Sequence, residues 1–200
     1  MTAFPPAIKS RPVYGTLTPR PGSLHLVVAD GEGAEAVCAL LAAAPAMRAT
    51  THILYAPGPT GTDLWPQLQS LHAAQAFRAP TIPTLLPRLQ HVLANAHMGT
   101  QIYLTGTEGL MGQAEREVMA MGFPYRAIQK EHRGSTLRRV QCVHCKGITE
   151  NVATDPFACS HCGLHLYVRD HYSRRLAAFQ GVNIDAEEPG NIPPPVVRFA

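Results

Sequence analysis

Cys142-Val143-His144-Cys145 and Cys159-Ser160-His161-Cys162 are the two stretches that decide how the C-terminal part of this 200-residue chain folds. Thirteen residues, 146–158, separate the two C-x-x-C pairs and would form a loop or a short hairpin. Each pair predicts a tight turn that points two thiolates at one ion, and two such turns complete a tetrahedral site of four sulfurs. The spacing therefore predicts a zinc ribbon in which the four cysteines are the metal ligands.

Two other interpretations of the same cysteines stay open. Iron accepts the same set of four thiolates, and four cysteines could also pair as two disulfides, although nothing in the chain suggests export. The spacing favours zinc. His144 and His161 lie inside the two pairs, but with four thiolates present we expect neither to be a ligand. A zinc ion with four thiolates has no open coordination position, so we expect it to hold structure and not to host a reaction.

Composition and charge set the broad class of the protein. Hydrophobic residues make up 46% of the chain and the net charge is +3, which suits a soluble globular protein and implies no partner alone. The N-terminal residues lack the apolar core of a signal peptide, and the longest apolar run, 36–47, is too short to span a bilayer. We therefore expect a cytoplasmic protein with no membrane partner. Cys38 lies within this apolar run, and we expect it to be a small buried hydrophobic residue.

The first two thirds of the chain alternate between apolar runs and helical patterns. This alternation predicts an α/β fold with a parallel sheet and helices on both faces. The expected strands are 23–29, 51–56, 101–105 and 125–129, and the expected helices are 34–44, 63–77, 83–98 and 108–121, the last capped by Thr107.

These elements divide the chain into four predicted parts. Residues 1–21 are rich in proline and form an extended arm, and residues 22–135 form the α/β domain. A polar and basic stretch, 130–139, leads into the ribbon, residues 136–168. In the last part, 169–200, we expect a short basic helix capped by Asp170 and then an extended tail, which would become ordered most easily against a partner surface.

The turn after the first expected strand reads Gly31-Glu32-Gly33-Ala34-Glu35-Ala36, a G-x-G-x-x-A pattern between a strand and a helix. Small residues at this place let a pyrophosphate approach the N-terminus of the helix. Asp30, Glu32 and Glu35, however, surround the point where two phosphates would lie and would repel them. The alternative is that the glycines make a tight turn and that the acids favour a helix N-terminus.

The stretch Tyr103-Leu104-Thr105-Gly106-Thr107-Glu108-Gly109-Leu110-Met111 resembles the last strand-helix unit of the nucleotide domain of ferredoxin–NADP reductases. The resemblance extends over about residues 22–131, with Thr105 where such reductases usually have a cysteine near the nicotinamide. It implies a reductase-like parallel sheet and an NAD(P)H site in which Gly31, Gly33, Thr105 and Gly106 are the cofactor-binding residues.

The two C-x-x-C pairs and the string Val168-Arg169-Asp170-His171-Tyr172-Ser173-Arg174-Arg175-Leu176, which leads to Gly181-Val182, resemble a second family. This family is the small accessory subunit of bacterial dimethylamine monooxygenase. The resemblance implies a heteromeric enzyme that uses NAD(P)H and O₂ to convert dimethylamine to methylamine and formaldehyde. It also implies that haem, flavin and iron–sulfur centres lie on partner subunits, and that this chain acts in assembly or intersubunit electron transfer. No catalytic residue is matched.

The alternative hypothesis is a zinc ribbon that binds nucleic acid. Between residues 125 and 175 there are nine lysines and arginines against four acidic residues. The basic side chains that could contact phosphates are Arg133, Arg138, Arg139, Lys146, Arg169, Arg174 and Arg175. Few aromatic residues lie near this cluster and the total charge is low, so we expect these side chains to be solvated or paired with an acidic protein partner.

Overall fold

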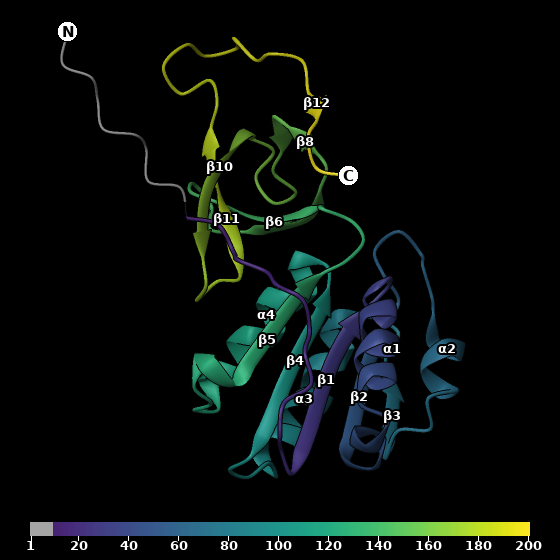
Figure 1. Cartoon of the computed structure of the whole chain (residues 1–200). Helices are drawn as coiled ribbons and strands as arrows, with labels where there is room; N and C mark the ends of the chain where they lie inside the picture. Colours follow the sequence, from purple (N-terminus) through teal and green to yellow (C-terminus); the bar gives the residue numbers. More distant parts are fainter. Residues whose placement is uncertain (1–9) are drawn as a thin grey trace, which may run out of the picture.

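A computed structural model describes residues 10–200, so the first nine residues of the predicted arm lie outside the described residues. The described residues form two five-stranded sheets and one two-stranded sheet (Figure 1), and the second five-stranded sheet lies beyond the carboxyl ends of the strands of the first. The first sheet has the strand order β3-β2-β1-β4-β5, and all its neighbouring strands are parallel. The predicted parallel α/β architecture is confirmed.

The elements of the first domain alternate as expected. They are β1 (Leu24–Asp30), α1 (Gly33–Ala43), the 3₁₀ helix η1 (Pro45–Thr50), β2 (Thr51–Ala56), α2 (Trp65–Gln69), β3 (Gln75–Arg78), α3 (Ile82–Ala94), β4 (Thr100–Gly106), α4 (Glu108–Ala120), the 3₁₀ helix η2 (Tyr125–Ala127) and β5 (Ile128–His132).

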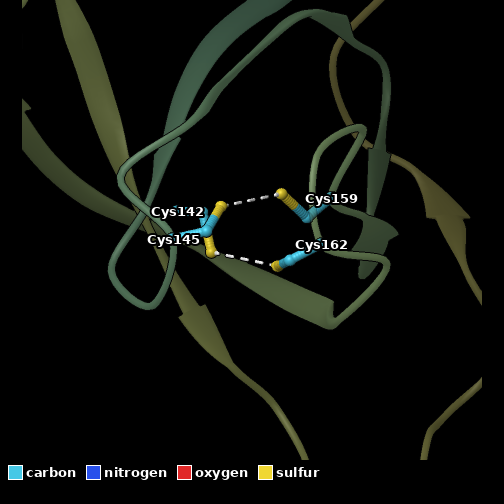
Figure 2. A group of neighbouring side chains, drawn as sticks. All are labelled: Cys142, Cys145, Cys159 and Cys162. Carbon is cyan, nitrogen blue, oxygen red and sulfur yellow. Dashed lines mark hydrogen bonds between the residues drawn. The ribbon is translucent and has the colours of Figure 1, made fainter.

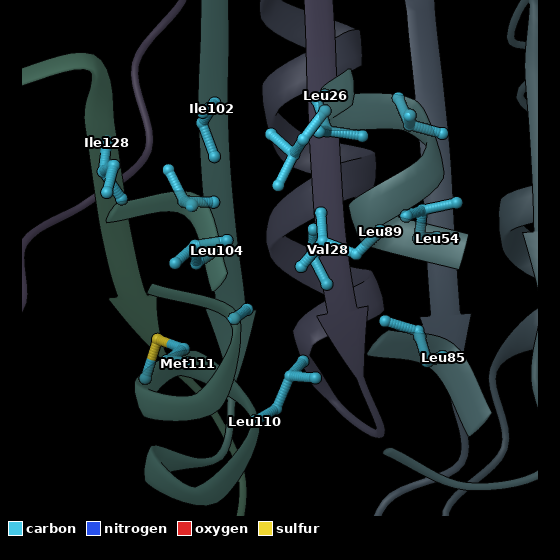
Figure 3. Close-up of a cluster of buried hydrophobic side chains, with 14 of the residues drawn as sticks. Leu26, Val28, Leu54, Leu85, Leu89, Ile102, Leu104, Leu110, Met111 and Ile128 are labelled. Carbon is cyan, nitrogen blue, oxygen red and sulfur yellow. The ribbon is translucent and has the colours of Figure 1, made fainter. Parts of the chain in front are cut away.

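Separate hydrophobic cores cover the two faces of this sheet. On one face, Leu26, Val28, Ile102 and Leu104 pack against α3 and α4 (Figure 3). On the other face, Val27 and Ala29 of β1 and Ile53 and Tyr55 of β2 pack against α1. The central strands are therefore buried on both sides, which explains why they consist of nearly continuous apolar runs.

Three predictions about this domain need correction. The helix expected over 63–77 is too long: only the short helix α2 forms there. The chain then forms the edge strand β3, whose four residues are all exposed. The strand expected over 125–129 lies later, at β5, so the stretch that we took as a linker from residue 130 begins inside the sheet. Thr107 does cap α4, because its hydroxyl accepts a hydrogen bond from the Leu110 N–H.

The second domain contains more strands than a minimal ribbon. They are β6 (Arg138–Cys142), β7 (Ile148–Val152), β8 (Thr154–Asp155), β9 (Phe157–Ala158), β10 (His165–Ser173), β11 (Ala178–Asn183) and β12 (Val196–Val197). Five of them form a sheet in the order β7-β6-β11-β10-β9. The short helix predicted from Asp170 is wrong, because Tyr172 belongs to β10 and Phe179 to β11, and the two residues pair across a hairpin.

Both ends of the described chain pack on the protein itself. Residues 10–22 cross both domains: Gly15 donates its N–H to the carbonyl of Lys130 at 2.8 Å, and Ser10 forms a bridge to His171 in β10. At the other end, β12 pairs with β8 and Phe199 is buried in the core of the second sheet. The tail that we expected to order against a partner therefore orders against its own domain. None of the described helices has the length and apolar character needed to cross a bilayer.

Candidate functional site

The four predicted metal ligands lie together between the loops of the second domain (Figure 2). Cys142 ends β6, Cys145 follows in the turn, and the other two cysteines lie in the turn between β9 and β10. The Sγ atoms of Cys142 and Cys162 are 3.9 Å apart, those of Cys145 and Cys159 are 3.7 Å apart, and all four lie within 4.8 Å of one another. A tetrahedral ion with metal–sulfur bonds of about 2.3 Å needs sulfurs about 3.8 Å apart, so this donor set fits zinc and equally fits iron.

Both cysteine turns are built from the same backbone hydrogen bonds. In the first, the Lys146 N–H bonds to the carbonyl of Cys142, and in the second the Gly163 N–H bonds to the carbonyl of Cys159, each at 3.0 Å. Lys146 and Gly163 both adopt a positive φ, of 63° and 75°, which turns the chain back sharply. The Gly147 N–H then points at the Sγ of Cys145, at 3.4 Å. The backbone thus aims the thiolates and neutralises part of their charge.

The two thiols of the second turn have pKa values that are shifted in opposite directions. Burial alone would raise the pKa of Cys159, but the N–H groups of Cys162 and His161 together with the thiols of Cys162 and Cys145 outweigh it and lower that pKa to about 6. The pKa of Cys162 moves in the opposite direction: the Leu164 N–H lowers it, but burial and the neighbouring thiols raise it further. Four adjacent sulfurs do not all ionise without a cation, so metal binding must release protons.

The two histidines near the cysteines have other roles. Among the residues that the structure describes, the group able to hold a metal consists of cysteines alone. The His161 ring lies where a side chain at Gly147 would be, 2.4 Å from the position of its Cβ, and His161 Nε2 is 3.0 Å from the carbonyl of Ile148. His161 therefore braces the two turns against each other, while His144 is exposed.

A second cluster lies at the carboxyl ends of β1 and β4, where the predicted cofactor-binding residues meet. Asp30 is fully buried, and its carboxylate accepts hydrogen bonds from the N–H of Thr107 at 2.7 Å and from its hydroxyl at 2.6 Å. Burial raises the pKa of Asp30 to about 6, although the Thr107 donors lower it in part. Glu32 accepts a hydrogen bond from the Thr62 hydroxyl and lies against the backbone of Gly134.

The predicted cofactor residues are all used in packing here. A Cβ on Gly33 would come within 2.6 Å of the Thr105 carbonyl oxygen, and one on Gly106 would overlap the Asp30 carboxylate. Gly31 packs in the same way against Gly58, because a Cβ on Gly31 would lie 3.0 Å from the Gly58 Cα. Thr105 is fully buried. Gly31, Gly33 and Gly106 therefore allow close packing between α1, β1 and β4, and their assignment with Thr105 to a cofactor stays a prediction. The carboxylates of Asp30 and Glu32 at this edge would repel the pyrophosphate of a dinucleotide.

Sequence reasoning missed two features of these sites. Thr149 accepts a hydrogen bond from the Ser160 N–H at 3.1 Å and so joins the strand after one cysteine turn to the other turn. Asp30 and Thr107 were noted separately, as an acid near a turn and as a helix cap, and their pairing across 77 residues had no signal in the sequence.

Comparison with known proteins agrees with this two-part architecture. A sequence model of the dimethylamine monooxygenase subunit DmmA-like N-terminal domain matches residues 6–128, and one of the C-terminal domain matches residues 139–182. The chain belongs to the dimethylamine monooxygenase subunit DmmA-like family. A relative from Ectopseudomonas mendocina (strain ymp), the heme-dependent oxidative N-demethylase delta subunit, is 30% identical over 167 residues, which cover 84% of this chain and 83% of the relative. The family resemblance inferred from the sequence is thus confirmed.

Solved structures with a similar fold include reductases. An intact type IV self-sufficient cytochrome P450 monooxygenase is 18% identical with a TM-score of 0.46, covering 82% of this chain and 21% of that one. Phthalate dioxygenase reductase is 16% identical with a TM-score of 0.45, covering 71% of this chain and 47% of that one. This DmmA-like chain therefore spans less than half of either structure.

Proposed function

We propose that this DmmA-like chain is a subunit of a heteromeric, NAD(P)H- and O₂-dependent dimethylamine monooxygenase, which forms methylamine and formaldehyde, and that it works in the cytoplasm. The observation that carries the proposal is that the two domain models of this subunit family match successive parts of the chain. Within the complex, the chain acts in assembly or in intersubunit electron transfer. Haem, flavin and iron–sulfur centres belong to the partner subunits.

The site of NAD(P)H binding is part of the same proposal. Asp30 and Glu32 place carboxylates where phosphates would have to lie, and backbone fills the space beside Gly33. NAD(P)H therefore binds to another subunit. Mixing the isolated chain with NADPH tests this, because we expect no change in the nicotinamide fluorescence, and saturable binding would contradict it.

The four cysteines hold a structural zinc ion. A zinc ion supplies no redox chemistry, so its part is to close the two cysteine turns and with them the second sheet. Supporting this, both turns bring N–H groups to the sulfurs and Cys142 and Cys159 are buried.

The assembly is tested on the complex and the metal on the isolated chain. The complex purified from its host should contain this chain by native mass spectrometry, and the separated chain should hold one zinc per copy by elemental analysis and show no visible absorption. Replacing Cys162→Ser should abolish the zinc and make the second domain sensitive to protease, whereas Cys38→Ser should change neither. Iron with visible absorption bands in the separated chain would contradict the structural role.

A nucleic-acid-binding role is not favoured by the side chains. Of the seven basic residues considered for it, Arg133 pairs with Glu131, Arg138 with Asp170, and Arg139 with Glu150. Paired cations attract phosphates less, so the free basic surface is smaller than the sequence indicated.

A further inference from the structure

A groove with an apolar floor lies at the amino ends of the parallel strands, at the opposite end of the sheet from the cysteine site. It has a volume of about 810 Å³ and lies between the ends of α3 and α4. Leu93, Met121 and Phe123 contribute apolar surface to it, and Leu93 and Phe123 also belong to the core beneath. Met98 also lines the groove and is 98% exposed. An exposed methionine beside an apolar depression is typical of a surface that adapts to a protein partner.

The charge of the groove has one sign. Arg20, Arg126 and His97 line it, and none of the described residues that line it is acidic. The Arg20 side chain donates a hydrogen bond to the Arg126 carbonyl at 2.9 Å, which holds the arm against η2. No described carboxylate forms an ion pair with either guanidinium. A partner that brings a carboxylate beside an apolar side chain would complement both properties of this groove.

The position of the groove separates it from nucleotide chemistry. Ligands of open parallel sheets bind at the carboxyl ends of the strands, whereas Gly99, Thr100 and Gly122 place this groove at the opposite edge. In Figure 1 this edge lies at the end of the molecule farthest from the second sheet. A protein that docks there leaves the cysteine site and the carboxyl edge uncovered.

We propose that the groove docks another subunit of the dimethylamine monooxygenase complex, through a segment that inserts apolar side chains and presents a carboxylate to Arg20 and Arg126. This inference rests on the proposed function and deepens it, because it assigns the contact surface. A second copy of this chain and a small molecule are the competing occupants.

The test is co-expression of this chain with the other subunits, followed by affinity measurement on the purified components. Met98→Glu and Arg126→Glu should each weaken association by roughly tenfold or more, since one removes an apolar contact and places a carboxylate that competes with that of the partner, and the other reverses a complementary charge. Both side chains are exposed, so folding should not change. Raising the salt concentration should weaken wild-type association and leave Arg126→Glu less affected.

The matched controls are Val196→Glu on β12, where the valine is 59% exposed, and Arg175→Glu, an exposed arginine in the loop after β10. Both should bind like wild type. If Met98→Glu and Arg126→Glu also bind like wild type, the groove is not the docking surface, although the proposed function stands. Failure of the wild-type chain to associate would remove the proposed function and this inference together. Self-association of the wild-type chain that Met98→Glu abolishes would assign the groove to a second copy instead.

Discussion

At the residue scale, the burial of Asp30 links the stability of the fold to pH. Its folded pKa of about 6 lies above the ordinary value because the carboxyl is buried. The folded state therefore holds this proton more tightly than the unfolded state, so the stabilising contribution is largest at low pH and is lost as pH rises through about 6.

The variant Asp30→Asn removes this titration. We expect the unfolding free energy of wild type minus that of the variant to fall by about 1 kcal/mol between pH 5 and pH 7. Urea unfolding of both proteins at each pH measures it, and any loss of metal at the acid end is common to both and cancels. A difference that stays constant with pH would show that Asp30 titrates normally.

One of the two candidate sites could be predicted from the sequence and the other could not. The cysteine cluster followed from spacing, because two short turns constrain four sulfurs locally. The arrangement of residues at the carboxyl edge of the parallel sheet did not follow from the sequence, because Gly33 and Gly106 are equally compatible with a phosphate site and with a close backbone contact. The structure shows that Gly33 makes a close backbone contact, with the Thr105 carbonyl oxygen 2.6 Å from the position of a Cβ.

At the scale of elements, the strands that were predicted well are the ones buried on both faces. β2 matches its prediction at both ends, and β1 and β4 differ by one residue at either end. β3 was missed because it is an edge strand with four exposed residues. The hairpin β10–β11 was mistaken for a helix because Asp170 interrupts the alternation of Leu166 and Val168. Asp170 is held there by ion pairs with Arg11 and Arg138, two distant residues.

The close packing of α1 against β4 predicts that adding one methyl group at Gly33 destabilises the fold. In Gly33→Ala the new Cβ meets backbone atoms of Thr105 and Gly106, which cannot move aside as a side-chain end can. We expect a loss of about 1–3 kcal/mol in unfolding free energy, measured by urea denaturation. Gly109→Ala is the control, since its Cβ has 3.8 Å of room in the first turn of α4 and should cost nothing. Unchanged stability of Gly33→Ala would mean that the gap beside α1 is open after all.

At the scale of the whole molecule, the two domains are joined by more than the chain between them. The arm contacts β5 through Gly15 and Leu17, and β10 through Ser10. Arg138 lies 3.9 Å from the ring centroid of Phe179 and 4.2 Å from that of Phe199, so the C-terminus is held to the start of the second sheet. The cysteine site and the groove therefore lie at opposite ends of one connected body.

The contact between α4 and the second domain offers a direct test of that connection. The Tyr172 hydroxyl lies 2.2 Å from where a Cβ on Gly112 would be, so Gly112→Ala should push β10 away from α4 without entering either core. We expect faster hydrogen exchange in residues 10–15 and 170–173, and faster proteolysis within 133–137, with metal content unchanged. Adding Tyr172→Phe removes the obstructing oxygen and should restore part of the protection, which a nonspecific loss of helix stability would not allow. Equal exchange in Gly112→Ala and wild type would show that the contact between α4 and Tyr172 does not hold the two domains together.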